Sequence, residues 1–327
     1  MSQKLSELPC EKRPDIFRPK WDQSSYLGRL KHFLTITNPL NLLADDEKLR
    51  ETEQIVLNYR KGIFNPSMTV DELWKVKHIY DSAFHPDTGE RMVSFGRMSA
   101  QVPCNTVLIT AMQVCYKSTI GTIVSQWLNQ TFNAVVNFTN RSGNTVTTNQ
   151  QLLLAYFGAT GGAVGTALGL NSVAKRFPPL INRLVPFAAV AAANFINIFM
   201  MRYREIEDGT DITNDKGEKV GASTVVAFCA LTEVLISRIG MSSLPMVLTP
   251  ICVNALMKKP WYRSRRWLDV ATQSLLAATL LLISTPGFCA LFPQRMKIPV
   301  NRLEKSVQED LRKKSYSEGV VYYNKGL

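Results

Sequence analysis

Apolar and polar residues divide the chain at about residue 100. Before this point they are mixed, and after it five long apolar runs alternate with short charged segments. Each run is close to the 20 residues with which an α-helix crosses about 30 Å of hydrocarbon. We therefore predict an all-α membrane protein with about five transmembrane helices, not a soluble bundle, which would have to bury most of these helices. The transmembrane domain covers 101–291, with spans at 102–120, 151–170, 180–201, 222–244 and 268–290.

The first run is the least apolar of the five, because it contains Asn105, Gln113 and several Ser and Thr residues. Apolar residues continue after it in WLNQTFNAVVNF (127–138), between polar ones. We interpret this second segment as a re-entrant or interfacial piece, since non-helical backbone at membrane depth occurs only where protein or a cavity surrounds it.

Residues 1–100 are predicted to form a soluble helical domain. DDEKLRETEQIVLNYRKG (45–62) begins with acidic residues and ends with basic residues and glycine, which is typical of a helix. Thr69 and Glu72 have the spacing of a capping box at the start of another helix. SSYLGRLKHFL (24–34) has an apolar face that packs on a core or lies on a bilayer surface. Residues 292–327 form a C-terminal tail.

Two asparagines, Asn194 and Asn197, interrupt the apolar run 180–201. Lipid cannot satisfy their amides, so both must face other helices or a polar cavity. One interpretation is hydrogen bonding between helices. The other is a substrate site, in which Asn194 and Asn197, with Asn105 as a partner, bind the carboxylate, ammonium or hydroxyl of a small zwitterion.

Two charged residues, Glu233 and Arg238, lie within the run 222–244. A charge at the bilayer centre costs about 2.5–3.5 kcal/mol on insertion scales, so such a residue usually faces a partner or a cavity. Arg238 can extend towards an interface. Glu233 is the better candidate for contact with a substrate.

Glycines recur every four residues in GATGGAVGTALG (158–169). Gly161, Gly165 and Gly169 form one row, and Gly158 and Gly162 form a second beside it. Small residues at this spacing let two helix backbones approach closely in lipid, so we expect the first row to pack against another span. The segment has neither GxGxxG nor GK[ST] and no strand before it, which excludes a phosphate-binding loop.

Charge favours a membrane over nucleic acid as the partner. Most of the net charge of +12 comes from residues after 100, where Lys and Arg lie between apolar runs and do not form one stripe. The segment 258–266 has five basic residues and no acid, and the loop before Arg183 is also basic. The positive-inside rule places these loops, with the N-terminal domain, on the inner side. Five spans then put the C-terminal tail on the opposite side.

The polar motif with the clearest local chemistry is HPDTGE (85–90). Proline, aspartate and glycine predict a turn, which we expect to act as a structural, gating or docking element before the first span. His85, Asp87, Thr88 and Glu90 are its polar members, and a cation or proton site is the alternative. The six cysteines and three histidines show no metal-ligand spacing. No catalytic motif is present, so we expect neither an enzyme nor a cofactor.

The chain resembles the sideroflexins, multispan proteins of the mitochondrial inner membrane. The resemblance extends from DSAFHPDTGE and GRMSAQVP through NQTFNAVVNFTNRSG, GTALGLN and RLVPFAAVAAANFIN to PGFCALFPQ and the closing YYNKGL. Glu233 stands where we expect a neutral residue. The resemblance implies that the N-terminal domain lies in the matrix. With five spans, the tail then lies in the intermembrane space.

Among sideroflexins, the chain is most similar to members that import serine for one-carbon metabolism. This implies a transporter of serine or similar small neutral amino acids, with the lipid bilayer as its surroundings. The alternative is a membrane-anchored scaffold or assembly factor, linked to respiratory complex I or to iron and haem homeostasis. An oligomer or respiratory-complex assembly partners are compatible with either function.

Overall fold

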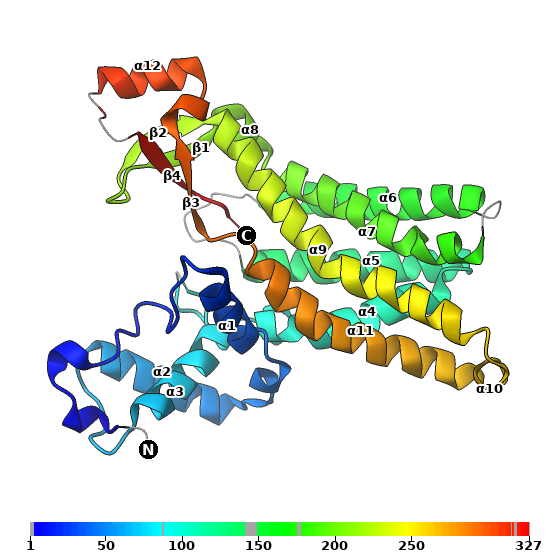
Figure 1. The fold of residues 1–327 in the computed structure, drawn as a ribbon, viewed down its shortest axis with the longest axis horizontal. Helices are drawn as coiled ribbons and strands as arrows, with labels where there is room; N and C mark the ends of the chain where they lie inside the picture. Colours follow the sequence, from blue (N-terminus) through cyan, green and yellow to red (C-terminus); the bar gives the residue numbers. More distant parts are fainter. Residues whose placement is uncertain are drawn as a thin grey trace.

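The chain folds into an N-terminal helical domain, a long helical bundle and a small sheet (Figure 1). The structure is a computed structural model, and it describes residues 3–86, 88–140, 149–174, 178–314, 316 and 319–326. Within these ranges most residues are helical, which confirms the predicted fold class. A four-stranded sheet, which we did not predict, is the exception.

The N-terminal domain consists of α1 (Tyr26–Ile36), α2 (Asp46–Arg60) and α3 (Val70–Ala83). The predicted capping box is present at the start of α3. The Thr69 hydroxyl accepts a hydrogen bond from the Glu72 amide, and the Glu72 carboxylate accepts one from the Thr69 amide. Apolar side chains of α2 and α3 form the core, and Leu49, Val56 and Leu73 are fully buried in it.

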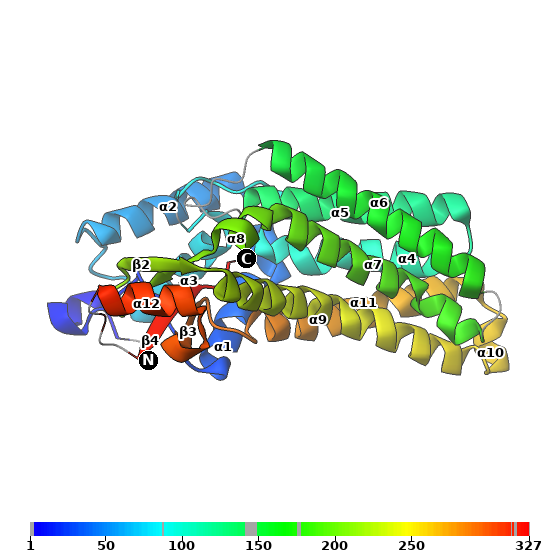
Figure 2. The same cartoon turned by 90° about the horizontal axis from the view of Figure 1, so that it is seen from above.

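Among the described residues, the bundle contains six long helices, and consecutive helices run in opposite directions (Figures 1 and 2). Short helices α8 (Tyr203–Asp208) and α10 (Pro260–Arg263) lie in two of the connections. In the described ranges, four helices are long and apolar enough to cross a membrane, over Gln150–Val173, Leu180–Met201, Thr224–Leu256 and Trp267–Cys289. The six long helices of the bundle are α4 (Gln101–Cys115), α5 (Thr119–Thr139), α6 (Asn149–Ala174), α7 (Pro179–Met201), α9 (Thr224–Leu256) and α11 (Arg266–Cys289).

The first predicted span, 102–120, is wrong. The chain turns after Cys115, and α4 is only 15 residues or about 22 Å long. Ser118 then caps a new helix by accepting a hydrogen bond from the Gly121 amide. The segment 127–138, interpreted as re-entrant or interfacial, is part of this 21-residue helix α5. The first apolar region is therefore a hairpin of two helices.

The sheet joins the loop after α8 to the C-terminal tail. Its strands are β1 (Thr210–Thr213), β2 (Lys219–Ser223), β3 (Arg295–Pro299) and β4 (Val320–Asn324), paired antiparallel in the order β2-β1-β4-β3. The helix α12 (Lys305–Lys313) lies between β3 and β4 in sequence. Fully buried Ile212, Val226 and Val321 join the sheet to the first turn of α9.

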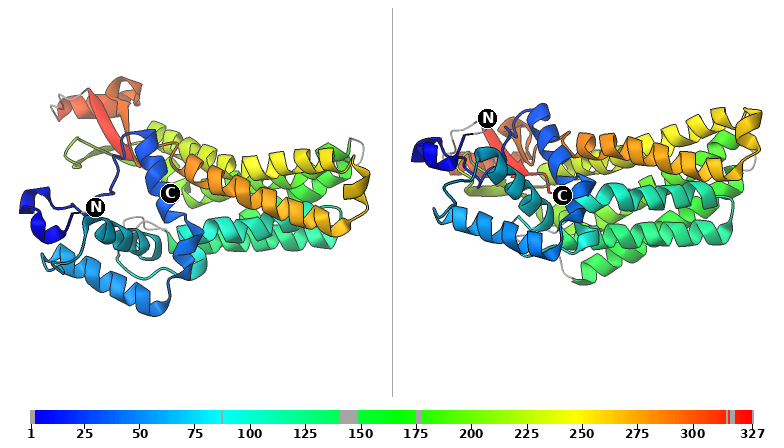
Figure 3. Two further views of the ribbon diagram at one scale, coloured as in Figure 1. Left: turned by 60° about the horizontal axis from the view of Figure 1, so that its bottom comes forward. Right: turned by 90° about the horizontal axis from the view of Figure 1, so that it is seen from below.

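The N-terminal domain and the C-terminal sheet lie at the same end of the bundle (Figures 1 and 3). Arg29 of α1 donates hydrogen bonds from Nε to the Ala290 carbonyl, at 2.8 Å, and from Nη2 to the Leu291 carbonyl, at 3.3 Å. These carbonyls end α11, where the tail begins. The prediction that the tail lies opposite the N-terminal domain is therefore wrong, because the α4–α5 hairpin makes the number of antiparallel helices even.

The basic loops lie at the other end of the bundle, which we call the α10 end (Figure 2). The segment 258–266 contains α10, and Arg183 is in the first turns of α7 at the same end. The structure thus separates the basic loops from the N-terminal domain. The charge argument that grouped them on one side of a membrane does not hold.

The helix α6 packs on α7 through the second row of glycines. An added Cβ would lie 2.3 Å from Met200 Sδ at Gly158 and 2.2 Å from Ile196 Cδ1 at Gly162. At Gly161, Gly165 and Gly169 it would meet no atom within 4 Å. The predicted packing row is therefore wrong: it faces outward, because the buried alanines that meet α7 share a face with the other row.

A hydrogen bond links α9 to α11 where a proline interrupts the hydrogen bonding of α9. Pro245 has no N–H, so the Met241 carbonyl, four residues earlier, loses its partner within the helix. The Ser284 hydroxyl of α11 donates to this carbonyl at 2.9 Å. The hydrogen bond removed by proline is thus replaced by one between helices.

Candidate functional site

The polar face of α5 points into the bundle. Seven polar residues recur along it at helical spacing, and six of them are buried: Thr122, Ser125, Gln126, Asn129, Gln130 and Asn137, with Asn133 half-buried. The large apolar residues on the other side are exposed: Ile120, Ile123, Val124, Trp127, Leu128 and Phe138. This distribution is the reverse of a soluble amphipathic helix. It fits a helix that borders lipid on one side and a polar interior on the other.

Several amide atoms on this inner face have no hydrogen-bond partner among the described residues. These atoms are Gln126 Oε1, Asn129 Nδ2 and Gln130 Nε2, and all are buried. Gln113 of α4 donates from Nε2 to the Pro245 carbonyl at 3.2 Å, while its Oε1 is also buried without a partner. Each unsatisfied buried group costs about 1–3 kcal/mol. An interior with so many is better suited to a polar solute than to a packed core.

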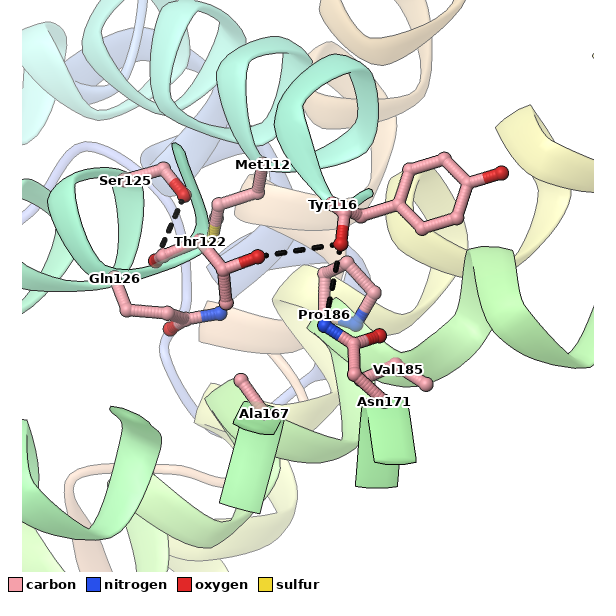
Figure 4. A pocket seen from close by; sticks show the side chains of 9 residues that line it. All are labelled: Met112, Tyr116, Thr122, Ser125, Gln126, Ala167, Asn171, Val185 and Pro186. Carbon is pink, nitrogen blue, oxygen red and sulfur yellow. Dashed lines mark hydrogen bonds between the residues drawn. The ribbon is translucent and has the colours of Figure 1, made fainter. Parts of the chain in front are cut away.

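A small cavity lies beside α5 at the α10 end (Figure 4). Its volume is about 10 Å³, which is about enough for a single water and too small for an amino acid. Thr122 Oγ1 and Asn171 Nδ2 both donate to the Tyr116 carbonyl at 3.2 Å, and these bonds join α5, α6 and the end of α4. Gln126 and Pro186 also line the cavity. This cavity therefore has no room for an amino acid.

A polar layer crosses the bundle nearer its other end. Asn137 Nδ2 of α5 donates to Asn197 Oδ1 of α7 at 3.0 Å, and Arg238 Nη2 of α9 donates to Asn137 Oδ1 at 2.8 Å. Each residue is 18 positions from the α10 end of its helix, or about 27 Å along the axis. Three helices thus place these side chains at one depth. We call Asn137, Asn197 and Arg238 the Asn–Arg layer.

The asparagines predicted to act together are only partly brought together. Asn197 is buried in the Asn–Arg layer. Asn194 is half-buried, and its side chain makes no hydrogen bond within the described part of the chain. Asn105 donates to Gln101 Oε1 at 3.1 Å in the first turns of α4. The partner of Asn197 is Asn137, which sequence reasoning missed although its spacing from Gln126 and Gln130 marks one helical face.

Glu233 faces the C-terminal sheet. The Tyr323 hydroxyl of β4 donates to Glu233 Oε1 at 2.8 Å, and Glu233 Oε2 is buried with no partner in the part of the chain that the structure describes. Burial and this hydrogen bond raise the pKa of Tyr323. The structure therefore places Glu233 at the junction between α9 and the tail, and outside the contacts of the Asn–Arg layer.

Comparison with known proteins identifies the family. The family model described as sideroflexins matches residues 15–327. The chain belongs to the sideroflexin family. Sideroflexin-3 of Mus musculus is 50% identical over 323 residues, covering 99% of this chain and all of that protein. Sideroflexin-1 of Homo sapiens is 47% identical over 313 residues, covering 96% of this chain and 97% of that protein. No solved structure matches the chain.

The HPDTGE motif of this sideroflexin forms the predicted turn between α3 and the bundle. The His85 amide donates to the Glu90 carbonyl at 2.8 Å, and the Thr88 amide donates to His85 Nδ1 at 3.2 Å. Gly89 has a φ of 69°, which favours glycine. Asp87 lies outside the described residues. His85 is buried while Thr88 and Glu90 are exposed, so these side chains do not form one pocket. A gating or docking role stays a prediction.

Proposed function

We propose that this sideroflexin carries serine or similar small neutral amino acids across the mitochondrial inner membrane into the matrix, where serine feeds one-carbon metabolism. The observation that supports this proposal best is the inward polar face of α5 with its unpaired amides. A helix that only anchored a soluble domain would gain nothing from buried glutamines and asparagines, because lipid and packed apolar helices satisfy neither donors nor acceptors.

Neutral amides suit a zwitterion. Asn and Gln each offer donors and an acceptor, so the same face can bind a carboxylate, an ammonium or a hydroxyl group. Along α5 these residues are one turn or less apart, from Thr122 to Asn137. A small polar solute can therefore exchange one set of hydrogen bonds for the next as it moves. Asn197 contributes from α7, and Asn194, Asn105 and Glu233 are candidates for further contacts when the bundle changes conformation.

The test is uptake of labelled serine by the purified chain in liposomes. Gln130→Leu removes an unpaired amide and keeps the side chain's approximate volume, so we expect thermal stability to stay equal or rise while uptake falls about tenfold or more. Leu128→Ala on the lipid-facing side is the matched control and should leave uptake unchanged. Absence of serine uptake by the wild-type chain would refute the proposal, and normal uptake by Gln130→Leu would refute the role of α5.

A scaffold or assembly function is the second candidate. The N-terminal domain has large apolar side chains on its surface, with Phe17 72%, Leu40 68% and Leu43 78% exposed. Such residues favour a protein partner, for example one that acts in assembly of respiratory complex I or in iron and haem homeostasis. Replacing all three with serine should release that partner and leave serine uptake intact. Loss of uptake without loss of a partner would argue against this function.

We infer the orientation in the inner membrane from charge. All charged residues of the segment 258–266 at the α10 end are basic, so the positive-inside rule favours the matrix for that end. The N-terminal domain, the sheet and the tail then face the intermembrane space. This orientation differs from the matrix placement that the family resemblance implies for the N-terminal domain. Protease treatment of mitochondria with a ruptured outer membrane should cleave tags at both termini.

A further inference from the structure

The helix α1 carries a stripe of large apolar side chains on its outer side. Tyr26, Leu30, Leu34 and Leu27 follow one another around the helix within about 100°. Leu27 is 67% exposed, Leu34 49% and Tyr26 43%, and Leu30 is half-buried. The rest of the helix packs on α3 and on the end of α11. We call these four residues the α1 stripe. Apolar side chains gathered on one exposed face mark an interaction surface.

Two residues of α1 fix the depth of this stripe in the molecule. The Tyr26 hydroxyl donates to the Gly287 carbonyl at 3.4 Å. Arg29, about 60° away around the helix, donates to the carbonyls of Ala290 and Leu291. Gly287 is in the last turn of α11, whose candidate span covers Trp267–Cys289. The α1 stripe therefore begins where this span ends.

The direction of α1 fits a membrane surface. The helix lies crosswise at the end of the long helices (Figures 1 and 3). A helix placed across the ends of helices that cross a membrane lies along the membrane surface. Ile283 is 63% exposed one turn before Gly287, on the same face of α11 and about 6 Å deeper along its axis. The exposed apolar surface of the span thus continues to the α1 stripe.

We propose that α1 is an interfacial helix whose stripe rests in the lipid bilayer, at the boundary between headgroups and acyl chains. A helix of this kind buries its apolar face about 5–10 Å into that boundary. Tyrosine is enriched at this level, because its ring is apolar and its hydroxyl is polar. Lys31 is exposed at the edge of the stripe, where its ammonium can extend to the headgroups. Lipid then holds the N-terminal domain against the membrane together with Arg29, whichever solute the bundle carries.

The first test measures the depth of α1 with the full chain in phosphatidylcholine liposomes. Single cysteines replace Leu27 or Leu34 in a chain whose native cysteines are changed to serine. Each carries a fluorophore whose emission moves to shorter wavelength in apolar surroundings. A spin label on the acyl chain near the headgroup quenches only fluorophores that touch lipid. Leu57→Cys is the matched control, because Leu57 is an exposed leucine on α2 outside the stripe.

We expect shifted emission and quenching by lipid at positions 27 and 34, and neither at position 57. Emission typical of water at positions 27 and 34 would overturn the proposal, and so would equal quenching at position 57. Shifted emission without quenching by lipid would show that protein, such as a second copy of this chain, covers the stripe. That result would also overturn the proposal.

The second test keeps the native cysteines. Leu27→Gln combined with Leu34→Gln removes apolar surface and retains good helix formers. Because lipid contact stabilises the docked helix, we expect the amides of α1 to exchange about tenfold faster in liposomes in this double variant than in the wild type. Leu57→Gln should leave exchange in α1 unchanged. Equal exchange in the wild type and the double variant would contradict the contact with lipid.

Discussion

Glu304 of the tail caps the first turn of α9, and replacing it should loosen the sheet from the bundle. Its carboxylate accepts hydrogen bonds from the Thr224 amide at 2.6 Å, the Val225 amide at 2.8 Å and the Ser223 hydroxyl at 2.6 Å. The first amides of a helix have no partner within it, and a negative charge at that end is stabilising. Glu304→Gln keeps the shape and removes the charge.

The size of the effect follows from the pKa of Glu304. Burial alone would raise this pKa, but the hydrogen bonds from Ser223, Thr224 and Val225 outweigh burial and lower it from 4.5 to about 2. That difference corresponds to about 3 kcal/mol of unfolding free energy, and solvent around the partly exposed carboxylate reduces it to about 1–2 kcal/mol. Because the pKa is lowered on folding, this stabilisation is complete above pH 4.5 and is lost as the pH falls towards 2.

Amide hydrogen exchange at 219–230 and 320–324 measures this effect at neutral pH. We expect exchange about tenfold faster in Glu304→Gln than in the wild type, since about 1.4 kcal/mol is a factor of ten. Glu309→Gln, at an exposed position on α12, is the control. The difference in melting temperature between wild type and Glu304→Gln should shrink below pH 4. Equal exchange in both variants, or a difference independent of pH, would refute the reasoning.

Three further outcomes follow from the fold. Arg29→Gln should free α1 from the end of α11. We expect faster proteolysis of the N-terminal domain and an unchanged melting temperature of the bundle, and unchanged proteolysis would contradict the role of Arg29 in docking α1. Gly162→Leu should destabilise the α6–α7 pair by about 1–3 kcal/mol in thermal unfolding. Gly161→Leu should not, because a Cβ added there has no neighbouring atom within 4 Å, and equal effects of the two substitutions would contradict the assigned packing row. Tags on the two termini should show the same protease accessibility, and opposite accessibility would contradict the even number of crossings.

The sequence predicted the features that depend on local pattern. The capping box of Thr69 and Glu72 requires only three residues of spacing, and it is present. The apolar run 180–201 corresponds to a candidate span over Leu180–Met201, because length and hydropathy alone define such a helix. The sideroflexin motifs could also be recognised from the sequence, since each is a contiguous segment of the chain. These predictions needed no knowledge of which helices meet.

The errors concern features that depend on tertiary contacts. The helix α5 was missed because the polar residues of its inner face lower its average hydropathy, although their spacing is regular. The partner of Asn197 is on another helix 60 positions away. The spacing of Asn137 places it on the polar face of α5, but nothing local indicates that this face meets Asn197. The sheet pairs β1 with β4, which lies more than 100 residues later in the chain. No local sequence pattern therefore indicates that these two strands pair. One missed helix was enough to place the tail on the wrong side of the bundle.

The central claim is that the inner face of α5 lines the path of the solute. Single cysteines in a chain whose native cysteines are replaced can be tested with a membrane-impermeant thiol reagent in liposomes. We expect labelling at Gln126, Gln130 and Asn133, slowed by serine, and none at Ile123 or Leu128 on the lipid-facing side. Labelling at the lipid-facing pair, or labelling of the inner face that serine does not slow, would contradict the claim.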